Sequence, residues 1–122
     1  MKTISYVNGV STTALLGETI GQNFKRIALQ FPKSDALVSV HQNYRADYFT
    51  FYNDTTKVSK ALIAAGIGKG DRVGIWAPNC FEWTLLQFAT ARIGVILVNL
   101  NPAYRPHEIE FAINQSGISL IV

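Results

Sequence analysis

The 122-residue sequence predicts an α/β fold, a partial doubly wound parallel sheet with helices on both faces. Over residues 72–122, strand-sized apolar runs alternate with helical patterns in the order β-α-β-α-β. The loops between these segments are short, as expected for right-handed crossovers between parallel strands. Before residue 72 the pattern indicates a helix, a short strand pair and a long helix.

The chain opens with residues 1–18, which show no clear period and are interpreted as a leading arm from which Leu15 and Leu16 could enter a core. The first helix should begin after Thr19, a residue type that caps helix N-termini well. Its apolar residues recur at helical spacing, namely Ile20, Phe24, Ile27 and Phe31. Pro32 ends this helix, because proline lacks an N–H and disfavours helix at the residue before it.

A short strand pair is predicted at residues 36–40 and 44–46, joined by a turn. Asp47 can then cap a long helix. One face of that helix would contain Phe51, Thr55, Val58, Leu62 and Ala65. Gly66 can end it in a left-handed conformation.

The glycine-rich segment 66–71 is not interpreted as a phosphate-binding loop. It fits neither the dinucleotide fingerprint nor the Walker pattern, because Lys69 is followed by Gly70 rather than by Ser or Thr. It also precedes a strand, whereas a phosphate-binding loop follows a strand and opens a helix. We therefore expect a helix-to-strand connection.

The second half is the clearest part of the pattern, beginning with a strand at residues 72–77. Asn79 is a candidate N-cap for a helix at residues 81–93, with Glu82 three residues later. That helix is apolar on most sides, so we expect burial on more than one side. The apolar run at residues 95–100 is typical of a central parallel strand. Pro106 begins the next helix, Gly117 ends it, and residues 118–122 begin a further strand.

Composition and charge exclude several classes of protein. Hydrophobic residues make up 48% of the chain and charged residues 16%, which suits a packed core rather than a disordered segment. No stretch approaches the roughly 20 apolar residues of a membrane-spanning helix, and no secretory signal is visible, so the cytoplasm is the expected compartment. The basic residues behind the net charge of +3 are scattered, which gives no support for nucleic-acid binding. Cys80 is the only cysteine, so an internal disulfide is impossible, and we interpret it as a small residue at a helix start.

The sequence stops inside an apolar strand at residues 120–122, although domains more often end in a surface segment. Ligands in open parallel sheets bind in the loops after the strands. Only the loops at 77–79 and 101–103 are present from the clear part of the sheet. We therefore expect residues 19–122 to be an N-terminal α/β subdomain of a larger, truncated protein.

Two stretches resemble the first core stretches of adenylate-forming enzymes: Gly70–Trp83 and Ala91–Arg105. Residues 114–117 followed by an apolar strand also fit. The sequence of these stretches most resembles the medium-chain fatty-acyl-CoA synthetase branch, to which residues 5–7, 15–16 and 19–21 are similar as well. The resemblance covers nearly the whole chain, but only about the first quarter of a typical family member.

The segment after Arg45 departs from the family pattern. Members usually have an aromatic residue and then Thr-Tyr there, with an acidic residue three past the Thr. Here Ala46, Asp47 and Thr50 occupy the corresponding places. Asp47 can still cap the helix, but the reciprocal half of a capping box is lost.

The resemblance implies a fatty-acid–CoA ligase that uses ATP, Mg²⁺ and CoA and passes through an acyl-adenylate. The family's phosphate-binding loop, metal-holding acid, ribose-binding Asp and mobile-domain Lys all fall beyond the position matching Val122. No catalytic, cofactor-binding or metal-binding residue is therefore expected in this chain, and the isolated chain should be inactive. Its partner would be the rest of its own polypeptide, and a fatty acid would be the substrate of the whole enzyme.

Three residues are weak candidates near a site: Asn79 and Asn101, which follow strands, and Tyr104, which could line an acyl pocket. For the two asparagines a local role is favoured, as an N-cap for Asn79 and as a turn residue for Asn101. His107 is expected at the surface.

Other functions stay open. The carboxylate could be an aryl or an amino acid, and the chain could instead be a stand-alone, non-catalytic α/β interaction module. Unpaired strand edges and exposed apolar surface would make a truncated sheet self-associate, so a clean monomer would favour the module. A phospho-acceptor receiver domain is set aside, because neither Ala77 nor Leu100 provides an acidic residue at a strand end.

Overall fold

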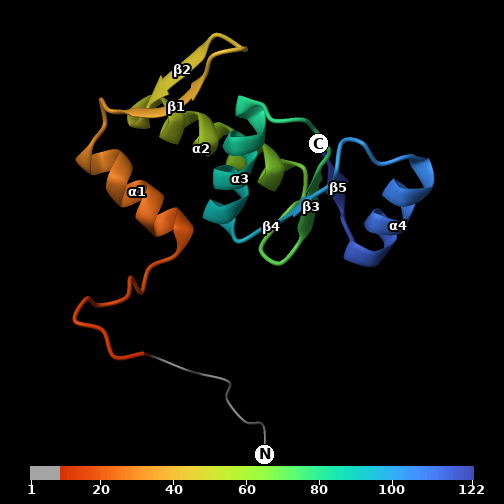
Figure 1. Ribbon diagram of the computed structural model, residues 1–122, viewed down its shortest axis with the longest axis horizontal. Helices are drawn as coiled ribbons and strands as arrows, with labels where there is room; N and C mark the ends of the chain where they lie inside the picture. Colours follow the sequence, from red (N-terminus) through yellow and green to blue (C-terminus); the bar gives the residue numbers. More distant parts are fainter. Residues whose placement is uncertain (1–8) are drawn as a thin grey trace, which may run out of the picture.

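The computed structural model describes residues 9–122, so residues 1–8 of the expected leading arm lie outside the described residues. The elements follow in the predicted order (Figure 1). They are α1 (Ile20–Gln30), β1 (Asp35–Ser39), β2 (Tyr44–Asp47), α2 (Tyr48–Ala64), β3 (Arg72–Ile75), α3 (Phe81–Ile93), β4 (Ile96–Asn99), α4 (Pro106–Ser116) and β5 (Leu120–Ile121).

The second half forms a parallel sheet with the strand order β4-β3-β5. β3 is therefore the central strand of the described sheet, and the expectation that the run 95–100 is central is wrong. Its two most buried residues, Val95 and Leu100, flank β4, whereas Ile96 within it is 47% exposed. An apolar run indicates that the side chains of a strand are buried, but it does not say which strand is central. The strand order depends on β5, far along the chain, which pairs with β3 and not with β4.

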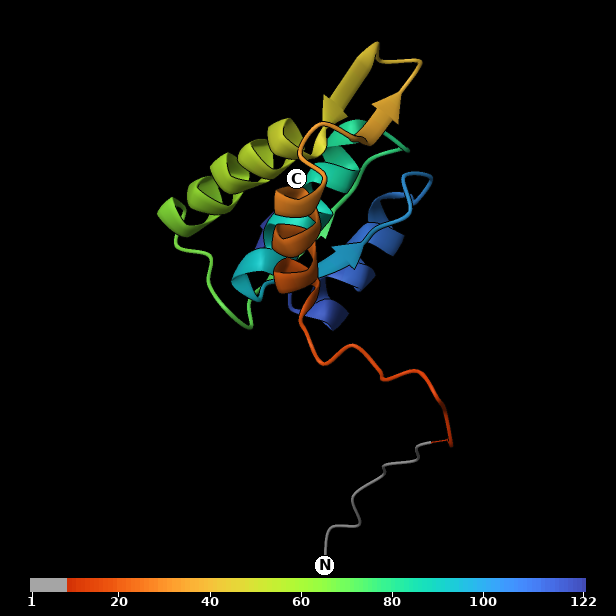
Figure 2. The same cartoon turned by 90° about the vertical axis from the view of Figure 1, so that its left-hand side faces the viewer.

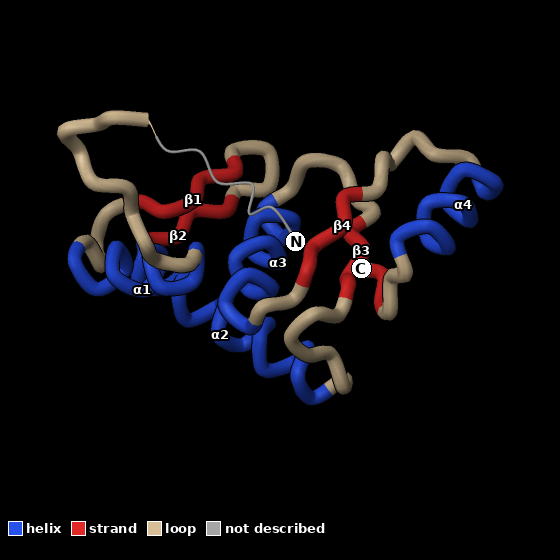
Figure 3. Tube along the Cα trace, turned by 90° about the horizontal axis from the view of Figure 1, so that it is seen from below, coloured by secondary structure: helices blue, strands red, loops and turns tan. Residues whose placement is uncertain are grey.

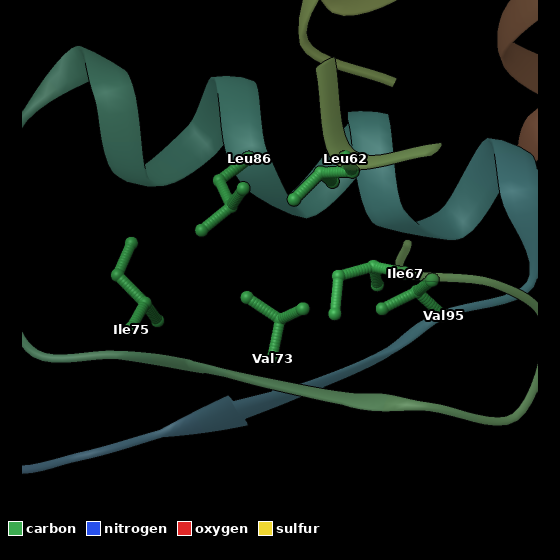
Figure 4. Packing of buried hydrophobic residues seen from close by; sticks show 6 residues of the cluster. All are labelled: Leu62, Ile67, Val73, Ile75, Leu86 and Val95. Atoms are coloured by element: carbon green, nitrogen blue, oxygen red, sulfur yellow. The ribbon is translucent and has the colours of Figure 1, made fainter. Parts of the chain in front are cut away.

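Helices lie on both faces of this sheet, as predicted. On one face, Val73 and Ile75 of β3 meet Leu62 of α2 and Leu86 of α3 in the main core (Figure 4). Figures 1 and 3 show α4 on the opposite side of the sheet from α2 and α3. No residue of α4 is buried, so this second layer is only lightly packed.

A second core joins the first half of the chain to α3. Phe24 of α1 lies 5.5 Å from Phe51 of α2 and 4.8 Å from Phe88 of α3, measured between ring centroids. Ala46 of β2 is buried in the same cluster. α3 thus packs against helices and against the sheet, which confirms its expected burial on more than one side.

The described part of the arm, residues 9–18, runs away from the body of the molecule (Figure 2). Leu15 is 80% exposed and Leu16 is 73% exposed, so the idea that they enter a core is wrong. The helical stripe is also narrower than expected. Of the four stripe residues expected for the first helix only Phe24 is buried, and Phe31 lies just after α1. At the end of the second stripe Ala65 is exposed and lies just after α2, which ends at Ala64.

Candidate functional site

The loops after β3 and β4 lie at the carboxyl edge of the sheet, where open α/β folds bind their ligands. Leu100 N, just after β4, donates to Ile75 O at the end of β3 at 2.9 Å, and the Trp76 indole Nε1 donates to Asn101 O at 3.1 Å and so joins the two loops. These two loops contain all three candidate residues, namely Asn79, Asn101 and Tyr104.

Asn101 forms the turn that leads into α4, as its sequence context predicts. Its side-chain Oδ1 accepts from Ala103 N at 3.0 Å, and its backbone carbonyl accepts from Tyr104 N at 3.0 Å. The first turn of α4 is then closed by Glu108, whose carboxylate accepts from Arg105 N at 2.7 Å. Asn101 is therefore a shaping residue of the loop in this structure.

Tyr104 borders a hollow of about 560 Å³ along the outer side of α4. The other lining residues are His107, Glu108, Phe111, Ala112 and Gln115. Phe111 is 65% exposed and Tyr104 is 38% exposed, so the apolar wall of this hollow faces solvent in the described chain. His107 is exposed, as expected.

Asn79 lies apart from this hollow, in a groove of about 220 Å³ between the loop after β3 and the β1–β2 hairpin. The structure thus brings Asn101 and Tyr104 together but places Asn79 beside Cys80 and His41. The expected role of Asn79 as an N-cap is wrong. Cys80 is the N-cap residue of α3, and its side chain makes no capping hydrogen bond.

The residue that caps α3 is Gln42, in the turn of the β1–β2 hairpin. Gln42 Oε1 accepts from Phe81 N at 2.7 Å, and Gln42 Nε2 donates to a Glu82 carboxylate oxygen at 2.9 Å. The donated bond from Gln42 is the main reason that the pKa of Glu82 lies below its ordinary range. Sequence reasoning missed Gln42, because no local pattern links a hairpin turn to a helix start so far along the chain.

Metal-binding clusters and the glycine-rich segment can be judged directly from the described residues. Among residues 9–122, no three His, Cys, Asp or Glu side chains lie close enough together to hold a metal ion. The segment 66–71 connects α2 to β3, as predicted, and is closed by Asp71, whose Oδ2 accepts from Gly68 N at 2.7 Å. No helix of the described part of the chain is long and apolar enough to cross a membrane.

An open α/β sheet with a loop cluster at its carboxyl edge defines a large class of ligand-binding folds. Within that class, this chain belongs to the AMP-binding enzyme family, whose model matches residues 24–122.

Named relatives agree with this membership. Over 120 residues the chain is 42% identical to the mitochondrial medium-chain acyl-CoA ligase ACSF2 of Danio rerio, covering 98% of this chain and 20% of that protein. It is 40% identical over 108 residues to the putative acyl-CoA synthetase YngI of Bacillus subtilis, covering 88% and 20%. The solved N-terminal domain of FACL13 from Mycobacterium tuberculosis superposes with a TM-score of 0.82 at 28% identity, covering 85% and 26%. The chain thus spans about a fifth of the curated relatives it matches.

Proposed function

We propose that this chain is the N-terminal part of a fatty-acid–CoA ligase. The observation that supports the proposal is the 42% identity to a medium-chain acyl-CoA ligase over nearly the whole chain, together with family membership. In the proposed reaction the fatty carboxylate attacks the α-phosphate of ATP, giving acyl-adenylate and pyrophosphate. The thiol of CoA then displaces AMP and leaves acyl-CoA.

The chain's own share of this chemistry is structural. We propose that the metal and the phosphate contacts of ATP lie in other parts of the enzyme, as the resemblance to adenylate-forming enzymes implies. Asn101 and Tyr104 are proposed to border the substrate path from the carboxyl edge of the sheet. Asn79 is proposed to lie at its margin, because its groove is separate from the hollow at Tyr104.

The proposed domain organisation is a leading arm at residues 1–18 and an N-terminal subdomain at residues 19–122 of a larger enzyme. Its partner is the rest of its own polypeptide, and the exposed wall formed by Tyr104 and Phe111 offers a surface for that partner. The proposed compartment is the cytoplasm, whereas the Danio rerio relative is named as mitochondrial.

The test is carboxylate-dependent exchange of pyrophosphate into ATP. The 122-residue chain and the full-length protein from the same gene are assayed side by side with fatty acids of increasing length, an aryl acid and amino acids. We expect exchange with fatty acids from the full-length protein and none from the 122-residue chain. Exchange by the short chain, or a preference of the full-length protein for aryl or amino acids, would contradict the proposal.

A further inference from the structure

α3 starts without a cap from its own neighbourhood. The first N–H groups of a helix have no partner within the helix, and side chains just before it usually accept from them. Neither Asn79 nor Cys80 does so here. The amide of Phe81 instead donates to Gln42 Oε1, so the cap comes from the hairpin between β1 and β2.

Both ends of the Gln42 amide are held in place. Its Oε1 also accepts from Ser39 Oγ at 2.8 Å, and Ser39 itself is only 9% exposed. Its Nε2 is committed to Glu82. Turning the amide over would place an NH₂ group against the Phe81 N–H and a carbonyl oxygen against a carboxylate, so the network permits one orientation.

An aromatic contact fixes the same junction. The rings of Tyr44 and Phe81 stack with their centroids 4.0 Å apart and their planes 6° from parallel. The hairpin therefore contacts the first residue of α3 through both its turn and its second strand.

The loop between β3 and α3 is consequently anchored at both ends. At its start, Trp76 N donates to Val122 O at 2.9 Å, and the Trp76 indole donates to Asn101 O. At its end, Phe81 is held by Gln42. Because this loop lies at the carboxyl edge of the sheet, we infer that Gln42 is a positioning residue that sets the loop after β3 for the substrate of the enzyme. The inference rests on the proposed function, which gives this edge a substrate.

The chain offers a reciprocal swap that tests this role. In the full-length protein, Gln42→Ala removes the cap, and Gln42→Glu keeps an acceptor for Phe81 N but sets two carboxylates against each other. Adding Glu82→Gln to Gln42→Glu restores the network with the carboxylate at position 42 and the amide at position 82. Gln87→Ala and Gln87→Glu are matched controls, because Gln87 is an exposed glutamine of α3, the helix that Gln42 caps.

Two readouts are needed. The first is the steady-state KM and kcat for the fatty acid. Loss of the cap should raise KM between about 10- and 100-fold with a smaller change in kcat, and the double variant should recover most of the loss. The second is amide hydrogen exchange at Phe81 and through residues 76–80, which should speed up in both single variants at position 42 and return towards the parent rate in the swap.

The outcomes separate the two hypotheses. Unchanged hydrogen exchange in Gln42→Ala would overturn the cap. Faster exchange with unchanged KM, or equal effects from the Gln87 controls, would overturn the positioning role. If the parent protein shows no carboxylate-dependent activity, the proposed function fails and the substrate role of Gln42 fails with it, while amide exchange still decides whether Gln42 caps α3.

Discussion

Single polar side chains decide where the helices of this chain begin. Thr19 and Gln22 form a reciprocal capping box at α1, in which Thr19 Oγ1 accepts from Gln22 N at 3.2 Å. Asp47 caps α2 alone, with Oδ1 accepting from Thr50 N at 2.8 Å. Bonds from Thr50, its backbone N–H first, are the main reason that the pKa of Asp47 lies below its ordinary range. Thr50 does not complete a capping box with a bond back to the Asp47 N–H, which agrees with the sequence prediction.

Replacing Asp47 by Ala should lower the free energy of unfolding at neutral pH, because the first turn of α2 loses the acceptor for Thr50 N. Because the folded-state pKa of Asp47 is depressed, its contribution is present above the ordinary pKa of the carboxyl group and is lost as the pH falls through the lowered value. The difference between parent and variant should therefore shrink in acid. Urea unfolding at neutral pH and below pH 4 measures it.

Asp54→Ala is the matched control, since Asp54 lies within α2 and pairs with Lys57 at 2.8 Å instead of capping the helix. Its cost should stay below about 0.5 kcal/mol. Equal costs for the Asp47 and Asp54 variants would mean that general charge, not the cap, explains the effect.

At the scale of elements, α2 and α3 are joined by polar contacts as well as by the core. The guanidinium of Arg92 on α3 donates through Nη1 to Tyr52 O at 2.9 Å and to the hydroxyls of Thr55 and Thr56 at 2.6 and 2.8 Å. Its Cζ lies 4.0 Å from the centroid of the Tyr52 ring. Arg92 therefore clamps the N-terminal half of α2 to the C-terminal part of α3.

Replacing Arg92 by Lys should destabilise the fold by about 1–2 kcal/mol, because a compact ammonium group on a flexible stem cannot stack on the Tyr52 ring as the planar guanidinium does. Arg72→Lys, at an exposed arginine, is the control and should stay within about 0.5 kcal/mol. Thermal unfolding of both variants measures the difference. A neutral Arg92→Lys would show that packing alone holds the two helices together.

Local signals explain why most elements could be predicted from the sequence. The bounds of α3 agree with the prediction, because Gly94 ends the helix in a left-handed conformation with φ of 74°. α4 begins at Pro106, as predicted, and Gly117 ends it in a left-handed conformation with φ of 66°. The position of β4 at the sheet edge could not be predicted, since it depends on pairing between β3 and β5. The candidate site was less predictable still, because the cap from Gln42 is a contact between distant segments.

At the scale of the whole molecule, the described chain is well packed around α1, α2 and α3 and weakly packed around α4 and the sheet edges. α2 and α3 contribute to both cores, and α1 contributes to the second. In contrast, α4 has no buried residue, and β4 and β5 are the edges of the described three-stranded sheet. Ile96 of β4, Ile121 of β5 and Phe111 of α4 expose apolar surface in this second half of the chain.

The 122-residue chain should therefore self-associate on its own, because unpaired strand edges and apolar patches attract further copies. Size-exclusion chromatography with light scattering over a range of protein concentrations checks this. We expect a mass that rises with concentration. A monomer that persists at high concentration would favour an independent interaction module over a subdomain of a larger enzyme.

The central place of β3 in the sheet also affects how the chain is made. The ribosome extends a chain from its N-terminus at roughly 5–20 residues per second, so β3 emerges before both of its neighbours. Until α3 and β4 follow, one hydrogen-bonding edge of β3 has no partner, and the other edge waits until β5 appears after α4. Nascent chains stalled after β3 has left the ribosome but before β5 has done so should consequently bind chaperones more strongly than completed chains, which co-purification of stalled complexes measures.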